Sequence, residues 1–267
     1  MLPQNRILLI TGMHRSGTSL CARWLHSMGL ELGSNLMLKG DASNPEGYFE
    51  DYEFLHWHNM ILSKNNTDYL ANVESRLEIN ETDRDTARRM IESRNATHGQ
   101  WAWKDPRACL FLPFWDNLIP ALHKLILFRP PDQTVDSLLR REFHDTARWK
   151  LVPLIKWQFK PQVKERQKDY LKSWMKHYEA VLEHYNVHNN LLISTTDLLQ
   201  NSREVARYLI EIFNFKLSYK SLTELLRKGR PLGITKYFCA GNDPILEEQA
   251  WAIYQRLMDQ AMRNLND

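Results

Sequence analysis

The chain has 267 residues, of which 43% are hydrophobic and 25% charged, and its formal net charge is +3. This composition is typical of a globular protein with enough chain for a large core, and it excludes a disordered or fibrous chain. The slight excess of basic residues suits an anionic ligand and gives by itself no reason to expect nucleic acid as a partner.

The first recognisable element is an apolar run over residues 7–11, which predicts a buried β-strand. A short turn rich in glycine, serine and threonine follows, and the next apolar periodicity predicts a helix over residues 17–28. A strand, a tight turn and a helix start in this order make a phosphate cradle, because the backbone N–H groups at the start of the helix point at the bound anion.

Gly12 and Gly17 have the spacing of a phosphate-binding loop, with four residues between them. Thr18 stands where nucleotide hydrolases carry a lysine, and Arg15 instead places a positive charge inside the loop. We therefore predict a grip on a phosphate ester that differs from that of an ATP or GTP hydrolase; an ordinary strand-turn-helix corner is the alternative. The candidate anion-binding residues of the loop are His14, Arg15, Ser16, Gly17, Thr18 and Ser19.

Further along the chain, hydrophobic periodicity predicts alternating helices and strands. In chain order, these are helices around 54–61 and 82–93, strands at 101–103 and 124–128, a helix that begins near Pro131, a helix at 162–185, a strand at 191–194, and helices at 201–213 and 244–265. Strands that alternate with helices predict an α/β fold, with a mostly parallel central sheet covered by helices on both faces in three layers. We expect one domain over residues 1–267, with the basic and aromatic segment 143–168 as a candidate lid and acceptor site.

Polar side chains follow two of the predicted strands. Lys104 ends the strand at 101–103, and Arg129 comes directly after the strand at 124–128, where ligands of open α/β sheets bind. Ser137 lies eight residues beyond Arg129, about two turns into the next helix, so both side chains could reach one group. Arg129 and Ser137 together would bind a second phosphate group. Alternatively, Arg129 caps the helix, Ser137 lies on the surface, and Lys104 is a solvated lysine at the end of a strand.

This set of motifs resembles the sulfotransferase family, whose members use 3′-phosphoadenosine 5′-phosphosulfate (PAPS) as donor. The resemblance rests on the Arg-Ser-Gly-Thr-Ser loop after the first strand and on the later arginine and serine eight residues apart. It is strongest for the bacterial branch, where a segment like 44–50 (Asn-Pro-Glu-Gly-Tyr-Phe-Glu) and a Lys-Asp-Pro-Arg turn like that at 104–107 also recur. A P-loop-like three-layer fold is what this resemblance implies.

The resemblance also implies a role for each candidate residue. The loop at 15–19 would hold the 5′-phosphosulfate, and Arg129 and Ser137 would hold the 3′-phosphate. Lys104, together with Arg15, would stabilise the leaving nucleotide, so that no metal is required. The products would be 3′,5′-ADP and a sulfated hydroxyl or amine.

Glu50 is the candidate base that removes the proton of the acceptor. Cytosolic members of the family use a histidine two residues after the lysine, but Pro106 stands at that place here. Other members use a glutamate after the second strand, and the segment that ends at Glu50 matches that place. Tyr48 and Phe49 flank this carboxylate, so we expect partial desolvation; an acidic residue at a helix start is the alternative.

Two positions depart from the family pattern or match it weakly. Residues 195–197 are Thr-Thr-Asp where cytosolic members carry a tyrosine that contacts the adenine, so that aromatic contact is missing or comes from elsewhere. Residues 227–229, Arg-Lys-Gly, reproduce a tripeptide that binds the 3′-phosphate in those members. A match of three residues is a weak signal for a second contact with the donor.

Two other functions stay open on the sequence alone. One is a P-loop kinase of small molecules or nucleosides, with Asp105 as a Mg²⁺ ligand. The other is a non-catalytic protein of the same fold that binds a nucleotide or a sulfated glycan. For a sulfotransferase we expect a small-molecule or carbohydrate acceptor and no nucleic acid, and the sequence does not identify that acceptor.

The sequence also carries indications of the compartment. We find no run of about 18 apolar residues and therefore predict no membrane span. The first strand begins close to the first residue, so we expect no secretory leader. Cys21, Cys109 and Cys239 are odd in number and far apart, which is typical of buried thiols in a reducing compartment. These observations predict a cytoplasmic protein.

Overall fold

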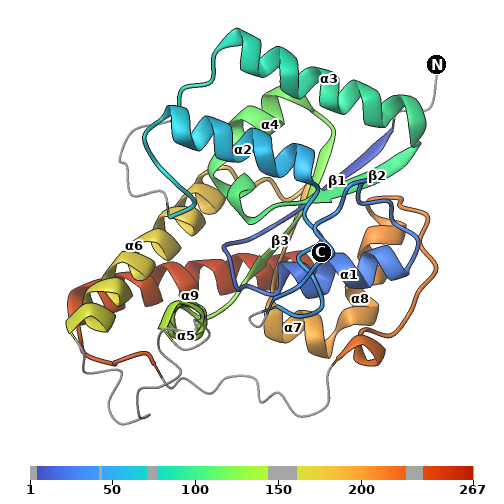
Figure 1. Ribbon diagram of the computed structural model, residues 1–267. Helices are drawn as coiled ribbons and strands as arrows, with labels where there is room; N and C mark the ends of the chain where they lie inside the picture. Colours follow the sequence, from blue (N-terminus) through green and yellow to red (C-terminus); the bar gives the residue numbers. More distant parts are fainter. Residues whose placement is uncertain (1–4, 42–43, 71–76, 144–160, 227–236, 267) are drawn as a thin grey trace.

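The computed structural model describes residues 5–41, 44–70, 77–143, 161–226 and 237–266 (Figure 1). A sheet of four parallel strands crosses this part of the chain, in the order β2-β1-β3-β4. Its strands are β1 Arg6–Thr11, β2 Gln100–Lys104, β3 Leu122–Phe128 and β4 Asn190–Ser194. The predicted α/β fold with a parallel central sheet is confirmed.

Helices connect these strands and follow the last one. They are α1 Thr18–Ser27, α2 Tyr52–Lys64, α3 Glu81–Thr97, α4 Leu112–Leu118, α5 Pro131–Phe143, α6 Pro161–Glu183, α7 Thr195–Gln200, α8 Ser202–Glu211 and α9 Pro244–Asn266, with short 3-10 turns η1 Pro106–Phe111 and η4 Leu222–Leu225. The helix expected at 201–213 is in fact preceded by α7, because the Ser194 side chain caps an additional short helix directly after β4.

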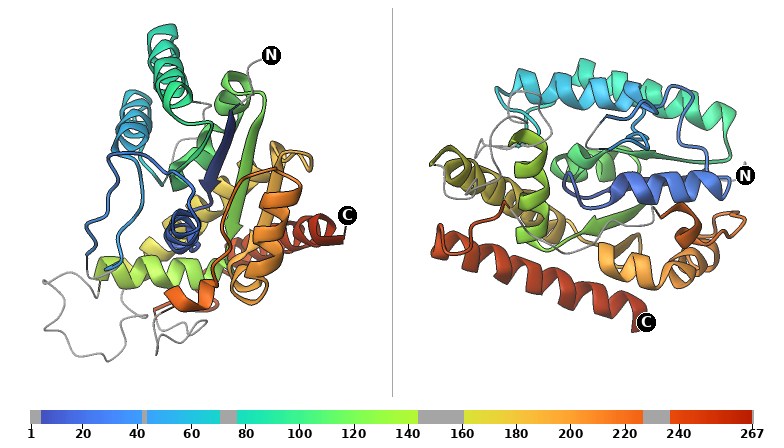
Figure 2. Two further views of the ribbon diagram at one scale, coloured as in Figure 1. Left: turned by 90° about the vertical axis from the view of Figure 1, so that its right-hand side faces the viewer. Right: turned by 60° about the horizontal axis from the view of Figure 1, so that its bottom comes forward.

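Helices lie on both sides of the sheet (Figure 2), and side chains on both of its faces are buried. Alternate strand residues point to opposite faces. In β1, Leu8 and Ile10 belong to the core cluster shared with α1 and α8, whereas Ile7 and Leu9 belong to the cluster shared with α2, α3, α6 and α9. The strands are therefore mainly apolar on both faces, and the hydrophobic runs of the sequence follow from this double coverage.

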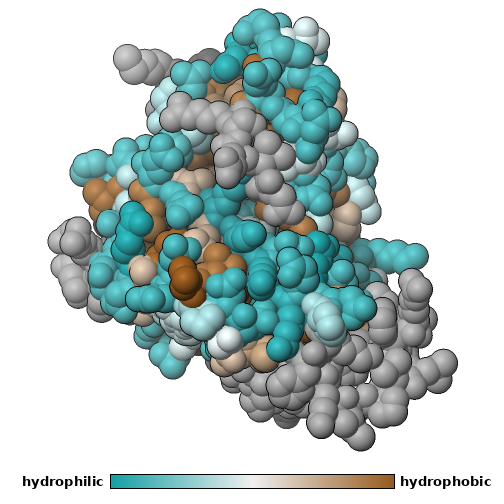
Figure 3. All heavy atoms as spheres, turned by 90° about the vertical axis from the view of Figure 1, so that its left-hand side faces the viewer, coloured by the Kyte–Doolittle hydropathy of each residue, from teal (hydrophilic) through white to brown (hydrophobic). Residues whose placement is uncertain are grey.

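Hydrophobic residues nevertheless reach the surface in small groups. The face drawn in Figure 3 is mainly hydrophilic, with hydrophobic residues scattered between polar ones.

Cys21 and Cys109 are buried thiols as expected, whereas Cys239 is half-buried, and all three are free. Among the described residues, no helix combines the length and the apolar character that crossing a membrane requires.

Two segments named in the sequence analysis fall partly or wholly outside the described residues. Of the candidate lid at 143–168, residues 144–160 are not described, and the part from Pro161 onward is the first portion of α6. The tripeptide at 227–229 also lies outside the described residues.

The parallel order of the strands brings their carboxyl ends to one edge of the sheet. In the register of the sheet, Ile10 pairs with Lys104, Thr11 with Ile126 and Phe128 with Ser194. From β1 the chain first adds β2 on one side and then crosses to add β3 on the other, so the strand order reverses between β1 and β3. The loop after β1 lies at this point. Open α/β sheets bind their ligands in the crevice at such a point.

Gly12, directly after β1, passes very close to the neighbouring strand. It has a φ of +137°, and a Cβ at this position would lie 2.0 Å from the carbonyl oxygen of Leu127. That oxygen is a backbone atom in the middle of the sheet and has no room to move. Only glycine fits here, and the loop is therefore held tightly against β3.

We expect Gly12→Ala to destabilise the protein far more than Gly29→Ala. Both glycines have positive φ, but a Cβ on Gly29 would meet no atom within 4 Å. Gly29→Ala should therefore cost about 1–2 kcal/mol from the backbone conformation alone, and Gly12→Ala should cost more than about 3 kcal/mol because the clash is added. Urea unfolding of both variants measures the difference, and equal losses would contradict the close approach.

Candidate functional site

The loop between β1 and α1 has the geometry of an anion cradle. Arg15 adopts a left-handed conformation with a φ of 72°, and the N–H of Ser16 donates to the carbonyl oxygen of Met13 at 3.1 Å, which closes the turn. Gly17 is the N-cap of α1 and offers no side-chain cap, and the first turn of this helix carries no acidic residue. The first N–H groups of a helix have no partner inside it, so α1 directs its positive end toward this turn.

Two side chains from later elements brace the cradle from within. The Tyr178 hydroxyl of α6 donates to the Leu127 carbonyl at 3.0 Å and lies 2.7 Å from the Ser16 hydroxyl. Because a tyrosine has one hydroxyl proton, the Ser16 hydroxyl is the donor of the second bond. The Thr195 hydroxyl donates to the Ser16 carbonyl at 2.7 Å. The structure thus turns Ser16, expected to donate to the ligand, toward the interior as a brace of the loop.

Arg15 links the cradle to the helix that follows β3. Its Nε donates to the Ser137 hydroxyl at 3.0 Å, whereas Arg129 donates to the Gln133 side chain, also at 3.0 Å. Ser137 therefore meets the loop rather than Arg129 directly. The two groups of candidate residues, separated by more than a hundred residues in the sequence, lie side by side at this edge of the sheet.

Positive charges are concentrated around this link. Burial, together with the neighbouring Arg140, Arg141 and Arg129, lowers the pKa of Arg15 to about 10. Burial and Arg140 likewise lower the pKa of Arg129. The buried Nε of Arg140 has no partner among the described residues. Because like charges packed together disfavour their own protonated forms, an anion bound among these guanidinium groups would be stabilised by all of them.

Lys104 and Glu50 form a buried ion pair beside the cradle. Lys104 is the last residue of β2, and its ammonium lies 2.7 Å from Glu50 Oε1 and 3.3 Å from the Ser19 hydroxyl. Glu50 is 4% exposed and also accepts from Arg107, whose Nη1 lies 3.3 Å from Oε2. The expected desolvation of Glu50 is present, but its closest polar neighbours are two cations.

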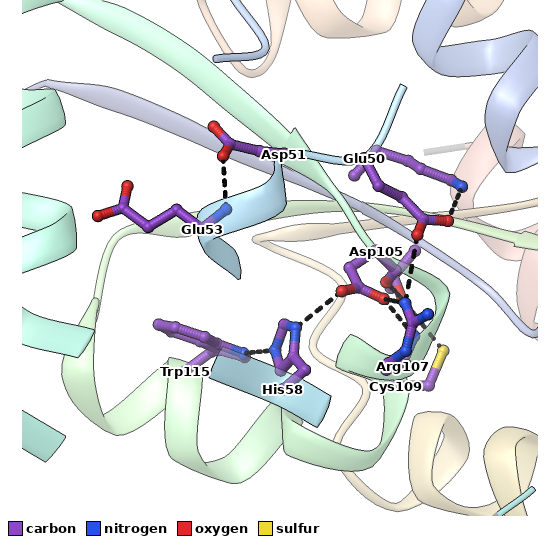
Figure 4. A network of polar contacts seen from close by, with 10 residues as sticks. Glu50, Asp51, Glu53, His58, Asp105, Arg107, Cys109 and Trp115 are labelled. Atoms are coloured by element: carbon purple, nitrogen blue, oxygen red, sulfur yellow. Dashed lines mark hydrogen bonds and ion pairs between the residues drawn. The ribbon is translucent and has the colours of Figure 1, made fainter. Parts of the chain in front are cut away.

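The structure ties Arg107 to Asp105 (Figure 4). Asp105 Oδ1 accepts from both the backbone N–H and Nη1 of Arg107, each at 2.8 Å. Although burial opposes ionisation, the Arg107 guanidinium and His58 hold the pKa of Asp105 well below its ordinary value. Both oxygens of this carboxylate are engaged inside the protein, which makes it a poor candidate for a Mg²⁺ ligand.

His58 completes the network from the side of the aromatic core. Its Nδ1 lies 2.9 Å from Asp105 Oδ2, and the indole N–H of Trp115 points at its Nε2 at 3.0 Å. An indole nitrogen only donates, so Nε2 of His58 carries no proton and Nδ1 is the protonated nitrogen that donates to Asp105. No local sequence signal reveals this arrangement, because Trp115, His58 and Asp105 come from three separate elements.

His14, the remaining loop candidate, is a neutral imidazole. Burial, followed by the charges of Arg107 and Lys104, lowers its pKa well below the ordinary value. Its ring contacts that of Tyr69 edge to face, with centroids 4.9 Å apart, and its buried Nε2 has no partner among the described residues. Within the same part of the chain, no group of three histidine, cysteine or acidic side chains is arranged to hold a metal ion.

Comparisons with known proteins give a match in structure alone. No family model and no curated protein matches the sequence. The chain is similar to the sulfotransferase domain from the curacin biosynthetic pathway, with 15% identity, a TM-score of 0.50, and coverage of 96% of this chain and 98% of that one. It is also similar to a sulfotransferase from Mycobacterium avium, with 13% identity, a TM-score of 0.58, and coverage of 97% and 77%.

A third solved structure, a sulfotransferase from Mycobacterium tuberculosis, has 13% identity and a TM-score of 0.50, with coverage of 93% of this chain and 77% of that one. The matches run over nearly the whole chain. This protein therefore has the P-loop-like fold seen in bacterial sulfotransferases, as the motifs predicted.

The hydrogen bonds of His58 predict its tautomer in solution. Nitrogen-15 NMR at neutral pH should show Nδ1 protonated and Nε2 unprotonated, the less common form of a free imidazole. His58→Gln identifies the resonances, and Trp115→Phe should move the Nε2 signal because it removes the N–H donor. A proton found on Nε2 in the wild-type protein would contradict the network as described.

Proposed function

We propose that this protein is a sulfotransferase that moves the sulfuryl group of PAPS to a hydroxyl or amine acceptor. The observation that supports this most is the hydrogen bond between Arg15 and Ser137, because it joins the cradle after β1 to the helix after β3. PAPS carries anionic groups at the 5′ and 3′ positions of one ribose. Two adjacent groups of anion donors are what such a molecule requires, and the Lys104–Glu50 pair stands beside them.

The chain's own residues fit the two ends of this donor molecule. We assign the 5′-phosphosulfate to the N-terminus of α1 and to His14, Arg15, Gly17, Thr18 and Ser19, with Ser16 bracing the loop through its hydroxyl. We assign the 3′-phosphate to Arg129 and Ser137. The guanidinium cluster around Arg15 supports this fit, since it concentrates positive charge where phosphate oxygens would lie.

Lys104 and Glu50 have complementary roles in the transfer. The acceptor oxygen attacks the sulfur in line with the bond to the 5′-phosphate, and Glu50 takes the proton of the acceptor. The sulfur–oxygen bond to the phosphate breaks with its electron pair on the phosphate oxygen, where Lys104 and Arg15 stabilise the charge. The transferred group is less anionic than a phosphoryl group, so this proposal requires no metal ion.

The two alternatives have less support. A P-loop kinase would use Asp105 as a Mg²⁺ ligand, but this carboxylate is committed to Arg107 and His58. A non-catalytic nucleotide or glycan binder would have no need of a buried carboxylate and ammonium beside the cradle, and binding without transfer would reveal it. The acceptor class stays open between small molecules and carbohydrates, with segment 143–168 as its proposed recognition element in a single domain.

Lys104→Ala should abolish most of the transfer while weakening the binding of 3′,5′-ADP much less. The loss removes a charge that acts mainly as the leaving group develops, so we expect kcat to fall by about a hundredfold to a thousandfold. Radiolabelled sulfate transfer from PAPS over a panel of hydroxyl and amine acceptors measures the rate, and calorimetry measures binding. A rate near that of the wild type would refute the role of Lys104.

Arg129→Ala should reduce the preference for 3′,5′-ADP over 5′-AMP. A charge-assisted hydrogen bond contributes about 1.5–3 kcal/mol, which corresponds to about a tenfold to hundredfold loss in affinity for the nucleotide with the 3′-phosphate only. Arg207→Ala, on the exposed surface of α8, is the control and should leave both affinities unchanged. If the ratio of the two affinities is the same in Arg129→Ala and the wild type, the assignment of the 3′-phosphate is wrong.

A further inference from the structure

We propose that Arg107 is a positioning residue for the transfer: it keeps the Glu50 carboxylate in place when Lys104 turns from Glu50 to the donor. Asp105 and His58 in turn fix Arg107. This inference rests on the proposed function and deepens it, because it assigns a task to a buried network that the donor itself does not need to touch.

The two oxygens of Glu50 have different partners. Oε1 lies 2.7 Å from the Lys104 ammonium, and Oε2 lies 3.3 Å from Nη1 of Arg107. Lys104 is also 3.3 Å from the Ser19 hydroxyl at the start of α1, so its ammonium already stands between the carboxylate and the phosphate cradle. When the ammonium moves toward the cradle, Oε1 becomes available to the acceptor proton and Oε2 keeps its contact with Arg107.

Arg107 cannot follow Lys104 because two hydrogen bonds to Asp105 hold it. Its backbone N–H and its Nη1 both donate to Asp105 Oδ1 at 2.8 Å. Asp105 is fully buried, and its second oxygen accepts from the protonated nitrogen of His58 at 2.9 Å. Trp115 in the aromatic core fixes the ring of His58 in turn. The network therefore connects a rigid part of the core to the carboxylate of the site.

The charges of the network also balance on both sides of the proton transfer. Lys104 and Arg107 are positive, and Glu50 and Asp105 are negative. In the transfer, the proton of the acceptor goes to Glu50 Oε1, which neutralises Glu50, while the broken sulfur–oxygen bond leaves its negative charge on the phosphate beside Lys104. Arg107 then still has Asp105 as its counterion and needs no rearrangement.

The groups that face Glu50 decide how the rate depends on pH. They are Lys104 from β2 and Arg107 from η1, with Asp105 behind Arg107 and His58 of α2 behind Asp105. His14 from the loop lies near Lys104 and Arg107. His14 is neutral because burial lowers its pKa. An opposite charge favours the ionised form of a carboxylate, so the loss of Arg107 should move the acidic limb of the kcat profile to higher pH.

Arg107→Gln and Arg107→Lys test the proposal on the full chain. In Arg107→Gln we expect kcat to fall by about tenfold to a hundredfold, the KM for the donor to stay within about twofold, and the acidic limb to move up by about one pH unit. Arg107→Lys keeps the charge and should recover most of kcat and the original limb. Equal kcat and equal pH profiles in Arg107→Gln and the wild type would overturn the proposal.

Lys124→Gln is the matched control for the loss of a buried cation. Lys124 is 2% exposed and pairs with Asp116 and with Asn190, toward the amino end of β3 and away from the site. Lys124→Gln should lower the melting temperature without changing kcat or the pH profile. If it lowers kcat as much as Arg107→Gln does, the effect of Arg107 is a general loss of stability and the positioning role is wrong.

The histidine offers a second, independent comparison. An asparagine at position 58 can present its amide N–H where Nδ1 of His58 lies, whereas a glutamine presents its polar end nearer to Nε2. His58→Asn should therefore keep more of kcat than His58→Gln, since only the former retains a donor to Asp105. Equal losses of kcat in the two variants would show that the hydrogen bond from His58 to Asp105 does not support the positioning of Arg107.

Carbon-13 NMR of the Glu50 carboxylate separates a failure of this inference from a failure of the proposed function. Glu50→Gln identifies the resonance, whose chemical shift should change in Arg107→Gln because Oε2 loses its N–H donor. A wild-type protein that neither binds 3′,5′-ADP nor transfers sulfate refutes the function, and the chemical shift then still tests the contact with Arg107. An unchanged chemical shift overturns the inference in either case.

Discussion

The parallel pairing of β1 with β2 on one side and β3 on the other is the constraint on which the rest of this structure depends. It brings Lys104, the loop at Gly12 and the start of α5 to one edge of the sheet. The close approach of Gly12 to the Leu127 carbonyl fixes the position of the loop relative to β3. Tyr178 and Thr195 then hold the loop from the side of the core, so that the start of α1 has one fixed direction.

The charges at this edge fall into two kinds. Asp105 and Arg107 form an ion pair in the interior, and this buried pair has further polar contacts, from Asp105 to His58 and from Arg107 to Glu50. Arg15, Arg129 and Arg140 instead crowd one another, and this proximity together with burial lowers the pKa of the first two. Glu50 and Lys104 lie between the two kinds. An anionic ligand would stabilise Arg15, Arg129 and Arg140, whereas the paired Asp105 and Arg107 are suited to holding a neighbouring side chain in one orientation.

The aromatic core reaches the site through one polar chain. Trp115 packs against Phe54 and Trp103 and donates its only N–H to His58. A polar network inside an aromatic cluster is stable when each donor and acceptor has a partner, and it then allows a single arrangement. The direction of every bond from Trp115 to Asp105 is set by the indole, which cannot accept. This explains how a buried histidine without metal partners among the described residues can still matter to the site.

The local pattern of the sequence determined the strands, most of the helices and the loop after β1, because hydrophobic periodicity and glycine spacing are properties of neighbouring residues. It also placed Lys104 and Arg129 at the ends of their strands. Only the tertiary structure decided that Ser137 meets Arg15, that the Ser16 hydroxyl turns inward, and that Arg107 stands between Asp105 and Glu50. These partners lie up to 162 residues apart in the chain, and packing between separate elements, which no local pattern encodes, brings them together.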